Sequence, residues 1–337
     1  TIGPASRLTG PAAKFVDPDR TANGEPRARV PLERLQTLWI NTGTLCNITC
    51  RNCYIESSPE NDRLAYITAS ETVPFLDEAG VLECRQIGFT GGEPFLNPEI
   101  LQLLRLALER GFEVLVLTNA MLPMQRPHIM TGLGSLRAKY GARLTLRVSV
   151  DHYTRALHDE ERGRGAFETA VRGVDWLVMG GFNVTIAGRT CWGETEGEER
   201  EGYRAMFAER GWPFDAGDTS VLTLFPEMES KTEVPEISLA CWGILKKRPD
   251  QMMCAHSRMV VKRKEAERPV VLPCTLLPYE PRFEMGATLA AAAAADGGMF
   301  ERGAVKLCHR HCAKFCVLGG GSCSGHPRGL FPTEPAS

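Results

Sequence analysis

The sequence predicts an α/β protein that consists of a partial (β/α)6 TIM-like barrel followed by a small cysteine-rich domain. Two observations lead to this fold class. From Leu35 onward, six strand-like runs alternate with helical patterns at regular spacing, which is typical of βα units around a parallel sheet. After Pro249 the alternation stops, and six of the twelve cysteines lie beyond that point.

The strand-like runs are mostly continuous apolar or β-branched stretches, as expected for a parallel sheet covered by helices. They lie near residues 37–42, 85–90, 113–118, 143–150, 183–189 and 219–225. Helices are predicted between them at 69–79, 98–110, 125–140, 166–180 and 196–210, with a sixth at about 236–247.

The chain is predicted to divide into four regions. An irregular N-terminal arm (1–35) precedes the barrel (36–248), which is followed by a second domain (249–326) and a tail (327–337). In the second domain, two short β-like runs at 258–263 and 268–272 predict a hairpin, and the alanine run at 289–295 predicts a helix.

Composition argues against several classes of partner. The 337 residues carry a formal net charge of -2, which gives no field that would attract nucleic acid or an anionic membrane. No apolar run of about 18 residues predicts a membrane span, and the first residues do not resemble a signal peptide. We therefore expect a cytoplasmic protein. Because cytosolic thiols are kept reduced, its cysteines are expected to be metal ligands or redox groups.

Three cysteines follow the first strand in a CxxxCxxC pattern: Cys46, Cys50 and Cys53. Loop cysteines at such spacing are typical of iron–sulfur ligands, and three thiolates leave one position of a four-ligand site open. A structural zinc site is the alternative. It would normally add a nearby fourth Cys or His, and none occurs between Cys53 and Cys84.

This motif resembles that of the radical SAM superfamily. In that family three cysteines hold a [4Fe-4S] cluster, and the fourth iron chelates S-adenosylmethionine (SAM). Many members carry an aromatic residue just before the third cysteine. This chain has Asn52 there and Tyr54 after the cysteine, so Tyr54 is the aromatic candidate for a cofactor contact.

A second part of the resemblance follows the second strand, where Gly91, Gly92, Glu93 and Pro94 match the family's GGE motif. In the family this motif binds the methionine amino group of SAM. Paired glycines let the backbone approach a ligand closely, and a carboxylate at a strand end can accept from an ammonium group. An ordinary βα turn is the alternative.

Further cofactor contacts are implied at the ends of later strands. Asn119 ends the third strand, and Ser149 at the end of the fourth would contact the ribose or methionine part of SAM. Arg162 lies in a segment that often follows the fourth strand in members with C-terminal clusters, and Arg189 could pair with the cofactor carboxylate. A capping or solvated role is the alternative for each.

The resemblance implies an enzyme. A reduced cluster would cleave SAM to a 5'-deoxyadenosyl radical, which would abstract hydrogen from a small-molecule or peptide substrate that is then oxidised or rearranged. The reducing partner would be a protein such as flavodoxin or ferredoxin. The 35-residue arm is too short for a peptide-binding domain, which favours a small molecule over peptide maturation. The alternative from another class is a non-catalytic iron–sulfur or zinc protein that carries electrons or regulates.

The second cysteine group resembles the auxiliary-cluster domains of radical SAM enzymes called SPASM or twitch, in which two cysteines bracket a hairpin and others follow a helix. One auxiliary [4Fe-4S] cluster that accepts an electron is implied. Its first-choice ligands, with Cys323 or Cys308 as a replacement for one of them, are Cys254, Cys274, Cys312 and Cys316.

Three further expectations concern the helix that carries the late cysteines, the metal at the second site and the role of Cys191. Cys308, Cys312 and Cys316 would share one face of a helix. Zinc is an alternative at this second site, because histidines lie nearby at 309, 311 and 326. Cys191 is a candidate hydrogen-atom or proton donor, although a buried inert thiol is the default for such a residue.

Overall fold

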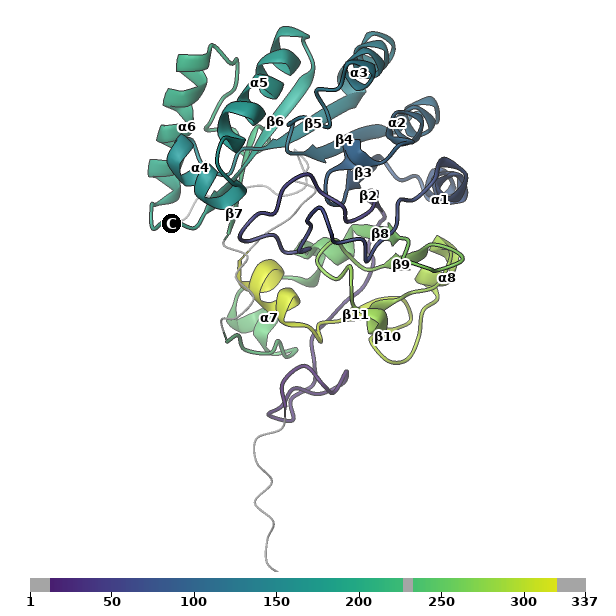
Figure 1. Ribbon diagram of the computed structural model, residues 1–337. Helices are drawn as coiled ribbons and strands as arrows, with labels where there is room; N and C mark the ends of the chain where they lie inside the picture. Colours follow the sequence, from purple (N-terminus) through teal and green to yellow (C-terminus); the bar gives the residue numbers. More distant parts are fainter. Residues whose placement is uncertain (1–12, 227–232, 320–337) are drawn as a thin grey trace, which may run out of the picture.

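The computed structural model describes residues 13–226 and 233–319 (Figure 1), and its central element is an eight-stranded sheet in the order β7-β6-β5-β4-β3-β2-β8-β9. Strands β2 to β8 pair in parallel with one another, and the edge strand β9 pairs antiparallel with β8. The six strands of the predicted barrel are β2 (Thr37–Asn41), β3 (Gln86–Thr90), β4 (Glu113–Thr118), β5 (Leu144–Ser149), β6 (Asn183–Thr190) and β7 (Leu222–Pro226). The predicted partial barrel is confirmed.

Helices cover the outer side of this sheet (Figure 1). They are α1 (Ala69–Val81), α2 (Ile100–Glu109), α3 (Pro127–Tyr140), α4 (Arg155–Arg162), α5 (Ala166–Met179) and α6 (Glu196–Arg210). Five of them match the predicted helices. The exception is α4, which the sequence did not predict.

The barrel interior is filled below the carboxyl ends of the strands. Trp39 of β2 is fully buried and pairs in register with Gly88 of β3. A Cβ atom on Gly88 would lie 2.4 Å from the Trp39 ring, so only glycine leaves room for the indole. Space for a ligand is consequently found at the strand ends, where the βα loops meet.

The helix predicted at about 236–247 is wrong, since only α7 (Cys241–Ile244) is helical there. Residues before it run extended along the N-terminal arm, where the Ala28 N–H donates to the Ile237 carbonyl at 2.9 Å. Glu236 forms a buried ion pair with Arg27 at 2.6 Å. These tertiary contacts override the local helix propensity.

The predicted hairpin is confirmed as β8 (Ser257–Val261) and β9 (Val270–Leu272). However, β8 pairs with β2, so the barrel sheet continues across the predicted boundary near residue 249. The alanine run forms α8 (Leu289–Ala293). In the arm, β1 (Arg29–Val30) joins a small sheet with two late strands, β10 (Phe300–Glu301) and β11 (Ala304–Lys306).

The last described element is a π-helical segment, Cys312–Leu318. Cys308 precedes it, so the predicted helical face shared by Cys308, Cys312 and Cys316 is wrong for the first of these residues. Cys323, His326 and the predicted tail lie outside the described residues. Among the helices that the structure describes, none has the length and apolar character needed to cross a membrane.

Candidate active site and second cysteine cluster

A cavity of about 1030 Å³, counting the open space at its mouth, lies at the carboxyl ends of the barrel strands. Glu93, Pro94 and Cys191 are not among the residues that line it. Ten residues expected at the site do line it: Cys46, Cys50, Cys53, Tyr54, Gly91, Gly92, Asn119, Ser149, Arg162 and Arg189.

The loop that carries the first three cysteines is held mainly by Glu161 of α4. Glu161 accepts hydrogen bonds from the Asn52 backbone N–H at 2.8 Å and from Asn52 Nδ2 at 3.0 Å, and its carbonyl accepts from the Arg51 N–H at 2.9 Å. Asn52, the residue just before the third cysteine, is therefore a structural link to α4. On the far side of the loop, the Tyr279 hydroxyl donates to the Ile55 carbonyl at 2.6 Å.

The glycine pair packs directly against the start of this loop. The Gly92 N–H donates to the Gly43 carbonyl at 2.8 Å. A Cβ atom on Gly91 would lie 2.4 Å from the Gly43 carbonyl oxygen, and one on Gly92 would lie 2.1 Å from that of Leu45. The two glycines thus let the end of β3 support the residue that precedes Cys46.

Glu93 lies behind the cavity wall and is bound by protein groups. Its carboxylate accepts from the Thr118 hydroxyl at 2.8 Å, from the Asn119 N–H at 2.9 Å and from the Phe95 N–H at 3.2 Å. Burial raises the pKa of Glu93 to about 7, although these hydrogen bonds act in the opposite direction. Through these contacts Glu93 joins the ends of β3 and β4.

An ionic cluster forms the wall next to Cys50. Arg162 binds both oxygens of Asp151, and Arg189 Nε lies 3.4 Å from the same carboxylate. Burial alone would raise the pKa of Asp151, but the two guanidinium groups outweigh it and hold the pKa at about 2. Arg189 also donates to the Asn52 carbonyl at 3.1 Å.

Two residues of this wall were not assigned from the sequence. Asp151 stands two positions after Ser149, at the end of the same strand, and that position was the signal that could have identified it. Glu161 had no such signal, because its role depends on how α4 packs.

Within the described ranges, no three or more His, Cys, Asp or Glu side chains converge closely enough to hold one metal ion. Zinc requires four donors at about 2.0–2.3 Å from one point, whereas a four-iron cluster takes each thiolate at a different iron. Burial raises the pKa of Cys46 to about 12, so its thiol is protonated until a metal binds and deprotonates it.

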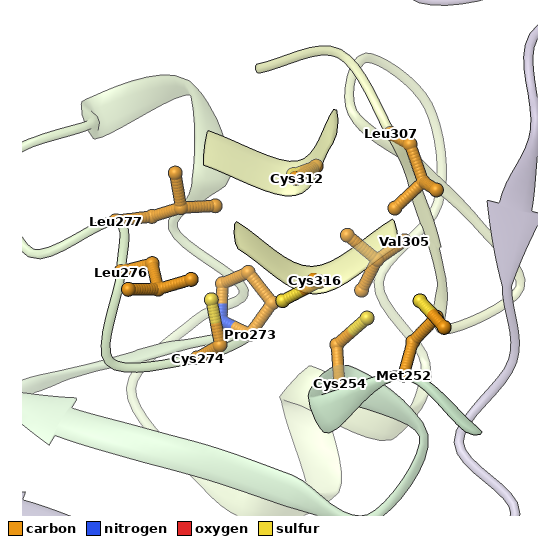
Figure 2. A pocket seen from close by; sticks show the side chains of 10 residues that line it. All are labelled: Met252, Cys254, Pro273, Cys274, Leu276, Leu277, Val305, Leu307, Cys312 and Cys316. Carbon is orange, nitrogen blue, oxygen red and sulfur yellow. The ribbon is translucent and has the colours of Figure 1, made fainter. Parts of the chain in front are cut away.

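A second, narrow pocket lies between the β8–β9 hairpin and the π-helical segment (Figure 2). Four cysteines line it together with six apolar residues. The cysteines are Cys254, Cys274, Cys312 and Cys316. Cys254 and Cys274 stand at the open end of the hairpin, and Cys312 and Cys316 lie one turn apart in the π-helical segment.

The other candidate ligands are elsewhere in the described part of this region. Cys308 is buried outside the pocket and donates from Sγ to the Asp17 carbonyl at 3.4 Å. His309 and His311 do not line the pocket, and His311 Nδ1 lies 3.0 Å from the Leu276 carbonyl oxygen. The described lining therefore offers sulfur ligands alone, the four cysteine thiols and the Met252 thioether.

Comparison with known proteins agrees with this geometry. The model of the radical SAM superfamily matches residues 40–202, the stretch that contains the three-cysteine loop, the glycine pair and both arginines of the ionic cluster. Residues 40–202 form a radical SAM domain.

Among relatives of this radical SAM chain is the antilisterial bacteriocin subtilosin biosynthesis protein AlbA of Bacillus subtilis. It is 32% identical over 42% of this chain and 30% of its own length. The AdoMet-dependent heme synthase of Oleidesulfovibrio alaskensis is 28% identical over 42% of this chain and 34% of its own length. The chain thus spans about a third of each of these relatives.

A solved structure has the same fold over a longer stretch. Streptococcus suis SuiB bound to S-adenosylmethionine superimposes with a TM-score of 0.58 at 14% identity, over 78% of this chain and 66% of that protein. The likeness extends well beyond residues 40–202. A [4Fe-4S] cluster and SAM are the cofactors that membership of the superfamily implies.

Proposed function

We propose that this protein is a radical SAM enzyme that holds a [4Fe-4S] cluster through Cys46, Cys50 and Cys53. It binds SAM in the cavity at the carboxyl ends of the barrel strands, called the rim cavity below. One observation carries the proposal. The three thiols line a single cavity together with the Gly91–Gly92 turn and the ends of β4, β5 and β6. Three thiolates leave one iron free for SAM.

Bound there, the cluster and SAM would supply a 5'-deoxyadenosyl radical for hydrogen abstraction. The chain's own residues bind the cluster and SAM and orient them. The glycine pair gives a ligand access to the backbone, and Asn119 and Ser149 offer polar contacts at adjacent strand ends. Arg189, Arg162 and Tyr54 complete the set that we assign to SAM. Cys191 is not included, because it does not line the cavity.

We further propose that residues 249–326 act as an auxiliary-cluster domain and that Cys254, Cys274, Cys312 and Cys316 hold a second [4Fe-4S] cluster, which accepts an electron from the oxidised substrate. The four cysteines that line the second pocket together support this ligand set. Its closed shell of four thiolates leaves no iron for SAM, which suits electron transfer better than SAM binding.

The substrate that we favour is a peptide. AlbA, the relative with 32% identity, is named for the biosynthesis of a bacteriocin, an antibacterial peptide. A small molecule is the second candidate, because another relative is named a heme synthase. The electron donor would be a small reductant such as flavodoxin or ferredoxin.

Electron paramagnetic resonance tests the assignment of the first cluster. Anaerobically reconstituted protein is reduced with dithionite, and spectra are recorded with and without SAM. The signal of the first cluster should change when SAM is added, and the variant with Cys46, Cys50 and Cys53 all replaced by Ala should show no SAM-dependent change. If the EPR spectrum of a fully iron-loaded wild type does not change when SAM is added, the proposal is overturned and a non-catalytic electron carrier is favoured.

A further inference from the structure

Arg258 of β8 is a buried cation next to the second cysteine pocket. Its side chain is among the largest that are fully buried, and the residue is 1% exposed. Nη1 donates to the carbonyl oxygens of Cys254 at 2.6 Å and Ser257 at 2.7 Å, and Nη2 lies 3.4 Å from the Gly303 carbonyl oxygen. Nε has no hydrogen-bond partner among the described residues.

No carboxylate neutralises this guanidinium group in the described part of the chain. Two other buried arginines do have one: Arg27 pairs with Glu236, and Arg162 pairs with Asp151. A buried arginine without a counter-charge is strongly destabilising, because desolvation is not offset by Coulomb attraction. Arginine cannot escape this by losing its proton.

Arg258 contacts the second pocket through Cys254, whose carbonyl oxygen accepts from Nη1 at 2.6 Å. Cys254 and Cys274 flank the hairpin that contains Arg258, and both line this pocket. Their thiols carry negative charge only when deprotonated, and a metal that binds them removes the protons. The missing counter-charge of Arg258 is therefore available when this pocket holds a metal centre.

We propose that Arg258 is the counter-ion of the auxiliary cluster and raises its reduction potential. The inference rests on the proposed auxiliary cluster. Reduction adds one negative charge to a four-iron centre, and a fixed buried cation stabilises the reduced form more than the oxidised form. A higher potential favours acceptance of an electron, so Arg258 is a positioning and tuning residue for that role and does not contact the substrate.

The test measures the midpoint potential of the auxiliary cluster alone. The protein in which Cys46, Cys50 and Cys53 are replaced by Ala serves as the background, because any remaining cluster is then the auxiliary one. In it, Arg258→Met removes the charge at similar volume, and Arg258→Lys keeps the charge. Iron content and a dye-mediated redox titration monitored by EPR are recorded for each.

Arg258→Met should retain iron and shift the midpoint potential to more negative values, by enough to change the oxidised-to-reduced ratio at a fixed potential by about tenfold. Arg258→Lys should stay close to the background protein. Loss of iron in the Met variant with retention in the Lys variant would equally support a counter-ion. An unchanged potential in iron-loaded Arg258→Met, or loss of iron in both variants, would overturn the inference. If the background protein itself binds no iron, the auxiliary cluster is refuted, which is a separate failure.

Discussion

Arg162 donates to both carboxylate oxygens of Asp151, from Nε to Oδ2 at 2.6 Å and from Nη2 to Oδ1 at 2.9 Å. Both side chains are buried, at 9% and 3% exposure. Asp151 follows β5, and Arg162 ends α4, so the pair fixes α4 against the barrel rim. Because Glu161 of the same helix binds the cysteine loop, the position of that loop depends on this ion pair.

Replacing Asp151 with Asn should therefore lower the free energy of unfolding by about 3–5 kcal/mol, since it leaves two buried guanidinium groups without a carboxylate. Urea unfolding of the reconstituted protein measures the change. Asp77→Asn is the matched control, because it breaks an exposed ion pair with Arg110 and should cost less than about 1 kcal/mol. Equal losses in the two variants would contradict a structural role for the Asp151 pair.

Replacing Gly92 with Ala should displace the loop before Cys46, since the new Cβ would lie 2.1 Å from the Leu45 carbonyl oxygen. We expect a loss of about 1–3 kcal/mol in stability and weaker binding of iron at the first site. Iron analysis and EPR measure the second effect. Gly134→Ala in α3 is the control, because a Cβ there meets nothing within 4 Å. Normal cluster loading in Gly92→Ala would show that this close contact does not position the loop.

Single Ala variants at Cys254, Cys274, Cys312 and Cys316 should each lower the iron content by about four atoms per chain if these thiols hold one [4Fe-4S] cluster. The EPR signal of the first cluster should persist in all of them. Cys308→Ala should keep its iron, because that thiol lies outside the pocket and bonds to the Asp17 carbonyl. The ligand set is incorrect if Cys308→Ala loses iron while one of the four variants does not.

Glu93 should make stability depend on pH. Its pKa rises from an ordinary value of about 4.3 in the unfolded chain to about 7 in the fold. The stabilisation contributed by its protonated form is fully present below the unfolded value and is lost as pH rises through about 7. Between pH 5 and 8, the free energy of unfolding should fall by about 2–3 kcal/mol more in the wild type than in Glu93→Gln. Parallel pH profiles for the two proteins would mean that Glu93 is ionised throughout.

The barrel strands could be predicted because buried parallel strands are continuous apolar runs. Helix α4 could not be predicted from such a pattern. Its buried residues are polar, His158, Glu161 and Arg162, and they are buried because they hold the cysteine loop and Asp151. The helix expected at 236–247 failed for the opposite reason, since a contact with Arg27, distant in sequence, determines the backbone there.

The candidate site could likewise be predicted only in part. The sequence motifs identify the thiols and the glycine pair, because their spacing is local. Other features depend on the chain path in three dimensions. These include the position of Glu93 behind the wall, the exclusion of Cys308 from the second pocket and the lack of a carboxylate partner for Arg258 among the described residues.

The central claim is that the rim cavity supports reductive cleavage of SAM, and the most direct measurement is the yield of 5'-deoxyadenosine and methionine from anaerobically reconstituted, dithionite-reduced protein. The wild type should form both products, and Cys53→Ala should form neither. Cys84→Ala should resemble the wild type, since that buried thiol donates to the Gln36 carbonyl, and Cys84 does not line the cavity. A wild-type protein with full iron content that forms no cleavage product of SAM would contradict the account.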